Sequence, residues 1–181
     1  MRVFVAVEIS NKRIINSIKQ LQKKINIDAN PTKSENLHFT LQFLGEVSDE
    51  KVSQIIKVLH TIEFSNFNIS LKGLGIFPRS NTPRIIWVGI SNEQEREMLI
   101  ELIKKVQKTL EGLGFSVKKT SKPHITIFRI KKKTRDITKE LNQYNTTEFG
   151  VQKITSIKLK KSDLTPDGPI YSDLTEVKAE E

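Results

Sequence analysis

The chain has 181 residues, enough for one substantial domain, and its 36% hydrophobic and 28% charged residues are typical of a globular protein. It contains no cysteine, which excludes disulfides, thiolate nucleophiles and zinc–thiolate sites. It has no apolar run of the roughly 20 residues that a membrane-spanning helix needs, and the N-terminus lacks a signal-peptide pattern. We therefore expect a cytoplasmic protein without a membrane partner.

The formal net charge is +9, which favours a polyanionic partner such as nucleic acid. A lysine-rich surface without any ligand would give the same value, so the charge alone does not separate the two interpretations. Local clusters of lysine give further information. Lys118 and Lys119 precede a motif at His124, and the lysines at 131–133 follow it. This arrangement favours an anionic ligand at that motif.

The first half of the chain alternates strand and helix patterns. Apolar residues recur with period 2 in the strands and along one face in the helices. In chain order we predict a strand over 2–8, a helix from 11 to about 26, a loop over 28–35, a strand over 37–44, a helix capped by Ser48, and one or two strands over 67–77.

The second half shows the same alternation. β-branched and aromatic residues mark its strands, and a capping box of Ser91 with Gln94 marks the start of its long helix. We predict a strand over 84–90, a helix ending near Gly112, a strand over 124–130, a short helix from 134 to about 142, strands over 149–159 and 170–177, and a loop over 162–169 between them.

The two halves therefore form an internal repeat, approximately 1–80 and 84–177, in which the order strand, helix, strand, helix, strand recurs. The repeat predicts one bilobal α+β domain over 1–181. In it, two antiparallel-type sheets face each other across a central groove, with the helices outside and a pseudo-two-fold axis between the lobes. A doubly wound parallel sheet is the alternative, but no glycine-rich phosphate turn follows the first strand.

Each half of the repeat carries a His-x-Thr-x motif, at 38–43 and at 124–128. Because side chains alternate across a strand, the histidine and threonine of each motif share one face, and the apolar residues, Phe43 included, share the other. Two of the three histidines lie in this pattern. The third, His60, has no threonine two residues later, and we interpret it as structural.

Two imidazoles facing each other across a groove are suited to acid–base chemistry near neutral pH. The two threonine hydroxyls can donate hydrogen bonds to the oxygens of a tetrahedral anion, so phosphodiester cleavage or its reverse is the reaction that this pattern indicates. No cluster with metal-ligand spacing lies near either motif, so we expect neither a metal nor another cofactor. Arg129 ends the second motif strand; alternation points it away from His124 unless the strand bulges.

These motifs resemble the 2H phosphoesterase superfamily, and in particular its RNA 2′,3′-cyclic phosphodiesterase branch, historically called 2′-5′ RNA ligase. The resemblance covers nearly the whole chain, and it depends on several segments in order rather than on one tetrapeptide. The segments are residues 2–7, 38–45, 83–89, 123–129, and 162–164 with 168–171.

The resemblance implies hydrolysis of the 2′,3′-cyclic phosphate at an RNA 3′ end, or on a nucleotide, to a 2′-phosphomonoester, and reversible joining of RNA through 2′-5′ linkages. It implies that His38 and His124 are the acid–base pair, that Thr40 and Thr126 donate to the phosphate, and that Arg129 contacts it. We assign His124 as the base that activates water and His38 as the acid that protonates the 3′ oxygen; the opposite assignment stays open because of the pseudo-symmetry.

A non-catalytic nucleotide- or RNA-binding module on the same scaffold is the alternative function. The intact histidine and threonine of both motifs argue against it. Phe4, Phe43 and Tyr171 are candidates for stacking on the bases, and a monomer is the default expectation for the oligomeric state.

Overall fold

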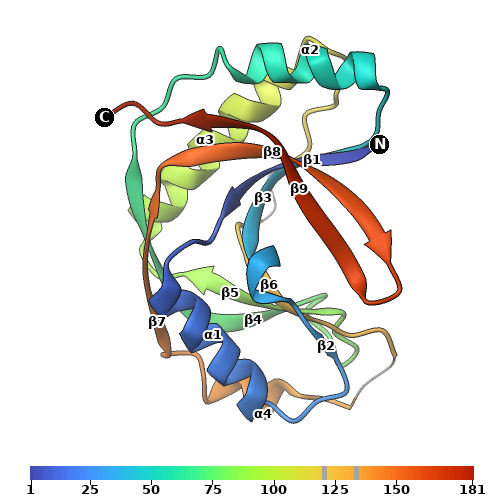
Figure 1. Ribbon diagram of the computed structural model, residues 1–181. Coiled ribbons are helices and arrows are strands. Elements are labelled where there is room, and N and C mark those ends of the chain that lie inside the picture. The colour runs from blue at the N-terminus through green and yellow to red at the C-terminus, as the bar shows by residue number, and fades with distance from the viewer. Residues whose placement is uncertain (120–121, 133–134) are drawn as a thin grey trace.

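A computed structural model describes residues 1–119, 122–132 and 135–181. It is an α+β structure in which α2 lies at one end of the molecule, α1 and α4 lie at the other, and the strands lie between them (Figure 1). The strands are β1 (Arg2–Glu8), β2 (Asn30–Pro31), β3 (His38–Glu46), β4 (Phe67–Phe77), β5 (Ile85–Ile90), β6 (Ile125–Arg129), β7 (Glu148–Ile154), β8 (Ser156–Thr165) and β9 (Gly168–Lys178). The helices are α1 (Lys12–Lys24), η1 (Ser34–Asn36, a 3-10 turn), α2 (Asp49–Leu59), α3 (Glu93–Glu111) and α4 (Thr138–Asn142).

The strands form one antiparallel sheet in the order β7-β4-β5-β6-β3-β1-β8-β9, and β2 pairs with β6. The two halves of this sheet meet where β3 pairs with β6, in a register of a single residue pair, Phe39 with Ile125. The α+β class and the antiparallel pairing are as predicted. The two predicted sheets are the two halves of one continuous sheet. One half is β7-β4-β5-β6, the other is β3-β1-β8-β9, and they join where β6 pairs with β3.

The two halves of the chain exchange strands. β4 comes from the first half of the sequence but pairs with β5 and β7, whereas β8 comes from the second half but pairs with β1. Each half-sheet therefore contains strands from both halves of the sequence, and neither half of the chain can complete a sheet alone.

The helices pack on the sheet through apolar faces. Asn11 caps α1 by accepting from the backbone N–H groups of Arg13 and Ile14, and the helix buries Ile14 and Ile18 against β6 and β7. α3 contacts β3, β4 and β5, so it spans the junction of the two half-sheets. In the part of the chain that the structure describes, no helix combines the length and the apolar character needed to cross a membrane.

Several predicted boundaries are wrong. α3 is capped by Asn92, whose side chain accepts from Glu95 N at 3.1 Å, rather than by Ser91. The predicted strand over 149–159 divides at Thr155 into β7 and β8, because these strands lie in opposite halves of the sheet.

The other differences concern segments that were predicted as loops. The predicted loop over 162–169 is the tip of a hairpin, since β8 and β9 stay paired as far as Thr165 and Gly168. The predicted loop over 28–35 contains β2 and most of η1. α4 begins at Thr138; its predicted start, residue 134, lies outside the described residues.

Candidate active site

Both His-x-Thr motifs line one cavity of about 240 Å³ at the junction of β3 and β6. The antiparallel pairing of these two strands brings the motifs together although they are far apart in sequence. The cavity is lined by His38, Thr40, His124, Thr126 and Arg129, together with Phe43, Gln42, Gln107 and three lysines, Lys118, Lys119 and Lys122.

The His38 imidazole is held at both nitrogens. Nδ1 lies 2.7 Å from the backbone carbonyl oxygen of Asn36, and Nε2 lies 2.9 Å from Thr40 Oγ1. Because a carbonyl can only accept, Nδ1 carries the proton, and neutral His38 accepts from the threonine hydroxyl at Nε2. Burial lowers the pKa of His38 to about 4, and the positive charges of Lys160 and Arg129 act in the same direction.

His124 repeats the Nδ1 half of this arrangement on the other side of the cavity. Its Nδ1 donates to the backbone carbonyl oxygen of Lys122 at 2.9 Å, which again places the proton on Nδ1 and the lone pair on Nε2. Burial lowers the pKa of His124, and Arg129 lowers it further. Both imidazoles are therefore neutral at neutral pH in the free protein, and each is locked in the tautomer whose Nε2 is basic.

A β-bulge follows the threonine of each motif. The register of β1 with β3 skips Leu41, since Val5 pairs with Gln42 and Ala6 with Thr40. The register of β5 with β6 skips Ile127 in the same way. An unpaired residue reverses the alternation beyond it. The residue five positions after each histidine therefore returns to the histidine's side of the sheet.

These returning residues are Phe43 and Arg129, and both line the cavity. The predicted position of Phe43 on the opposite face is wrong for this reason. The bulge that would bring Arg129 to the His124 side is present. The Arg129 guanidinium also borders an adjoining cavity of about 520 Å³ next to His38 and Tyr171, so it lies where the two cavities meet.

Two aromatic rings, those of Phe4 and Tyr171, pack against His38. The centroid of the Phe4 ring lies 5.1 Å from that of the His38 imidazole and 4.9 Å from that of the Tyr171 ring. Tyr171 meets the imidazole edge-on, with 5.5 Å between the ring centroids. Phe4 is only 3% exposed, so it packs behind His38 and offers no free face to a base. Phe43 is 59% exposed at the rim of the cavity, and Tyr171 lines the adjoining one, so these two keep a surface that a ligand can reach.

Two aromatic residues that we did not predict flank His124. Phe77 meets its imidazole edge-on at 4.9 Å, and Trp87 lies 6.0 Å away. Trp87 lies on β5, the strand next to β6 in the sheet, and Phe77 lies on β4, the strand beyond it. The internal repeat held a usable signal, because Phe77 lies near the end of the first half and Trp87 in the opening strand of the second half, as Phe4 does in the first.

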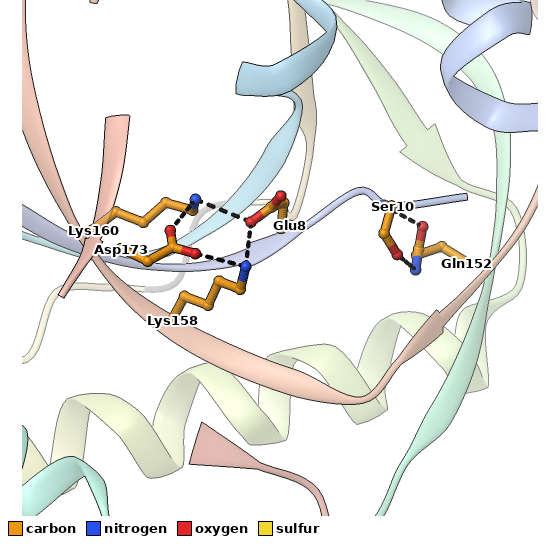
Figure 2. A network of polar contacts seen from close by, with 6 residues as sticks. All are labelled: Glu8, Ser10, Gln152, Lys158, Lys160 and Asp173. Atoms are coloured by element: carbon orange, nitrogen blue, oxygen red, sulfur yellow. Dashed lines mark hydrogen bonds and ion pairs between the residues drawn. The ribbon is translucent and has the colours of Figure 1, made fainter. Parts of the chain in front are cut away.

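A cluster of four charged side chains lies beside His38, at the junction of β1, β8 and β9 (Figure 2). Glu8, whose Cα pairs with that of His38, accepts from Lys158 at 2.8 Å and is 3.0 Å from Lys160. Asp173 accepts from the same two lysines at 2.7 and 2.6 Å.

The opposite charges of this cluster compensate one another. Burial alone would raise the pKa of Glu8, but the hydrogen bonds from Lys158 and Lys160 outweigh it and lower that pKa. Hydrogen bonds to Asp173 and Glu8 raise the pKa of Lys158 against the effect of its own burial. Lys160 is 5% exposed, and its ion pairs with Glu8 and Asp173 connect β8 to β1 and β9, the strands that carry Phe4 and Tyr171.

The cavity that holds both motifs is suited to an anion. Its described lining includes four cationic side chains and no aspartate or glutamate. Within residues 1–119, 122–132 and 135–181, no three histidine, cysteine, aspartate or glutamate side chains are grouped so that they could hold a metal ion. His60 lies outside the cavity, where its Nε2 is 2.9 Å from Thr175 Oγ1. A tetrahedral anion in the cavity would have two basic nitrogens, two hydroxyls and a guanidinium around it.

The chain belongs to the family described as the AKAP7 2′5′ RNA ligase-like domain, whose model matches residues 2–178. This membership confirms the resemblance to the 2H phosphoesterase superfamily that the motifs indicate.

Individual relatives agree with this assignment over most or all of their length. The chain is 38% identical to the RNA 2′,3′-cyclic phosphodiesterase of Archaeoglobus fulgidus, over 96% of this chain and 98% of the relative. It is 41% identical to that of Aeropyrum pernix, over 81% and 84%. The crystal structure of TT0787 of Thermus thermophilus superposes with a TM-score of 0.81 at 26% identity, covering 98% of this chain and 97% of the other.

Proposed function

We propose that this protein hydrolyses the 2′,3′-cyclic phosphate at RNA 3′ ends to a 2′-phosphomonoester, without a metal, through His38 and His124. The observation that carries the proposal is that both motifs and Arg129 line one cationic cavity, with both imidazoles in the tautomer whose Nε2 is basic. The relatives named RNA 2′,3′-cyclic phosphodiesterase support this substrate.

In the proposed reaction one imidazole takes a proton from water as its oxygen attacks phosphorus. The bond from phosphorus to the 3′ oxygen breaks, and the other imidazole gives that oxygen a proton. The threonine hydroxyls and Arg129 donate to the non-bridging oxygens, where negative charge accumulates in the transition state. The bound phosphate raises the pKa of the imidazoles, so that the pair holds the one proton that the reaction needs.

The electrostatics of the site favour a particular distribution of roles. Burial lowers the pKa of both imidazoles, and it does so more strongly for His38, whose pKa falls to about 4. A single proton on the pair therefore resides preferentially on His124. This distribution of the proton favours His124 as the acid and His38 as the base, the opposite of the assignment made from the sequence.

Turnover of an oligonucleotide that ends in a 2′,3′-cyclic phosphate, in the presence of EDTA, tests the proposed activity. We expect a 2′-phosphate product, and we expect the alanine variant of either motif histidine to lose about 10²–10⁴-fold in rate. Activity that disappears on chelation would contradict the metal-independent mechanism. Tight binding of RNA without turnover would instead support the non-catalytic binding module.

An activated substrate tests the roles of the two histidines. A p-nitrophenyl phosphodiester has a leaving group that needs little protonation, so the loss of the general acid costs less on it. We expect His124→Ala to recover activity on this substrate relative to the cyclic phosphate, and His38→Ala not to recover. The opposite result would restore the assignment made from the sequence.

Ligation through a 2′-5′ linkage is the same chemistry with a 5′-hydroxyl in place of water. Product analysis at high concentrations of RNA ends, with 5′-hydroxyl oligonucleotides present, measures how much of the cyclic phosphate is ligated rather than hydrolysed.

A further inference from the structure

A third cavity, of about 530 Å³, lies beside His124. Phe77 and Trp87, which contact His124, form its wall on that side, and no residue of either His-x-Thr motif lines it. Lys122 lines both this cavity and the central one, so the two adjoin. The volume is within the range of about 300–1,000 Å³ that is typical of small-molecule sites.

The Trp87 indole lines this cavity and carries a hydrogen-bond donor that has no partner among the described residues. Trp87 is 8% exposed, and its buried Nε1 has no hydrogen-bond partner among the residues that the structure describes. The indole packs directly on Gly75, where an added Cβ would overlap the ring, and the Lys122 ammonium lies 5.2 Å from the ring centroid. Buried donors are rarely left unpaired, so this N–H points to a ligand that accepts from it.

The other polar groups of the cavity define the ligand further. Arg79 and Lys122 supply two cations, the described lining includes no carboxylate, and Asn142 and Asn145 contribute amide groups. The apolar wall of Phe77 and Trp87 suits a flat ring. A phosphate, a planar heterocycle and hydrogen-bonding edges occur together in a nucleotide.

We propose that this cavity binds a second nucleotide of RNA, distinct from the one that carries the cyclic phosphate. The inference rests on the proposed function, because that function places RNA in the adjoining central cavity. Lys122 and Arg79 hold the phosphate of the second nucleotide, and the Trp87 N–H donates to its base or sugar. This nucleotide either precedes the cyclic end in the same strand or belongs to a separate strand, and the experiment distinguishes these sources.

The test compares cytidine 2′,3′-cyclic phosphate with a dinucleotide that has the same cyclic end. We expect Arg79→Ala and Trp87→Phe each to lower kcat/KM for the dinucleotide about tenfold more than for the mononucleotide, the effect of one charge-assisted or buried hydrogen bond. Arg13→Ala, an exposed arginine on α1, is the control that keeps the wild-type ratio. Equal losses on both substrates would show that the cavity only supports His124.

A separate strand is detected by adding a 5′-hydroxyl oligonucleotide to the mononucleotide reaction. If the Arg79→Ala effect is confined to reactions that contain this oligonucleotide, the cavity binds a second strand. If the effect instead follows the length of the cyclic substrate, the cavity binds the preceding nucleotide. Either result supports the second site.

Trp87 is the only tryptophan of the chain, so its fluorescence reports on this cavity without labelling. Titrations with cytidine 2′-monophosphate and with the dinucleotide 2′-phosphate need no turnover, and they stay informative if the proposed hydrolysis fails. We expect the dinucleotide to bind about tenfold more tightly and Arg79→Ala to remove that difference. Equal affinities of the two compounds for the wild-type protein, with no response of Trp87 to the separate 5′-hydroxyl oligonucleotide, would overturn the proposal.

Discussion

The depressed pKa of His38 predicts a loss of stability on mild acidification. The pKa falls from the ordinary value of 6.5 to about 4 in the folded protein, chiefly because the imidazole is buried. The unfolded chain therefore takes up a proton as the pH falls below about 6.5, whereas the folded protein takes it up only near 4. The contribution of His38 to stability is constant above this window and decreases as the pH falls through it.

The size of the effect follows from these two pKa values. Between about pH 7.5 and pH 5.0, His38 alone should lower the free energy of unfolding by about 2 kcal/mol, because a tenfold change in a protonation equilibrium corresponds to about 1.4 kcal/mol. The lower limit of about pH 5.0 keeps the measurement above the range in which most carboxylates titrate.

Urea unfolding of the wild type and of His38→Gln over this pH range measures the effect. The glutamine variant should lack this component, so the stability difference between the two proteins should change by about 2 kcal/mol across the range. His60→Gln, outside the cavity, controls for the removal of a histidine. If His38→Gln loses stability with falling pH as steeply as the wild type, burial does not hold His38 neutral.

Three other substitutions test separate parts of the structure. Arg129→Gln should raise the pKa of both motif histidines, because the guanidinium opposes their protonation, and NMR titration measures this change. The same substitution should lower the turnover rate by about 10²-fold, because the phosphate loses a hydrogen-bond donor. Lys160→Met should lower the free energy of unfolding in urea by about 1–3 kcal/mol, because its two carboxylate partners lose a buried cation. Lys161→Met is the control and should change that free energy by at most about 0.5 kcal/mol. Equal costs of the two substitutions would contradict a structural role for the cluster. Gly75→Ala should displace the Trp87 ring, with a change in its fluorescence and a cost of about 1–3 kcal/mol; an unchanged spectrum would contradict the close packing.

The sequence was sufficient for most elements and for the pairing of the two motifs. Periodicity located the strands and helices because their apolar faces are buried, as in β1, where Val3, Val5 and Val7 are at most 2% exposed. The repeat and the parity of the motifs predicted one site with two histidines and two threonines. The structure places these four side chains around a single cavity.

The remaining features depend on pairing between distant strands, which periodicity does not report. The bulges at Leu41 and Ile127 exist because a neighbouring strand skips one residue, so the positions of Phe43 and Arg129 could not be derived from alternation. The charged cluster joins side chains from three strands, and each of its lysines looked like a solvated surface residue in the sequence. The exchange of β4 and β8 was hidden for the same reason.

That exchange has a consequence for the order in which the protein folds. The half-sheet that carries His38 needs β8 and β9, which span residues 156–178, so it stays incomplete until these residues have been synthesised. Contacts between β1 and β8 close a loop of about 150 residues, and closure over such a separation slows folding. During synthesis β1 lacks its partner strand β8, and the unpaired edge of β1 is a site for association with other chains. We expect ribosome-bound chains that end before β8 to be sensitive to proteolysis, and full-length chains to be resistant.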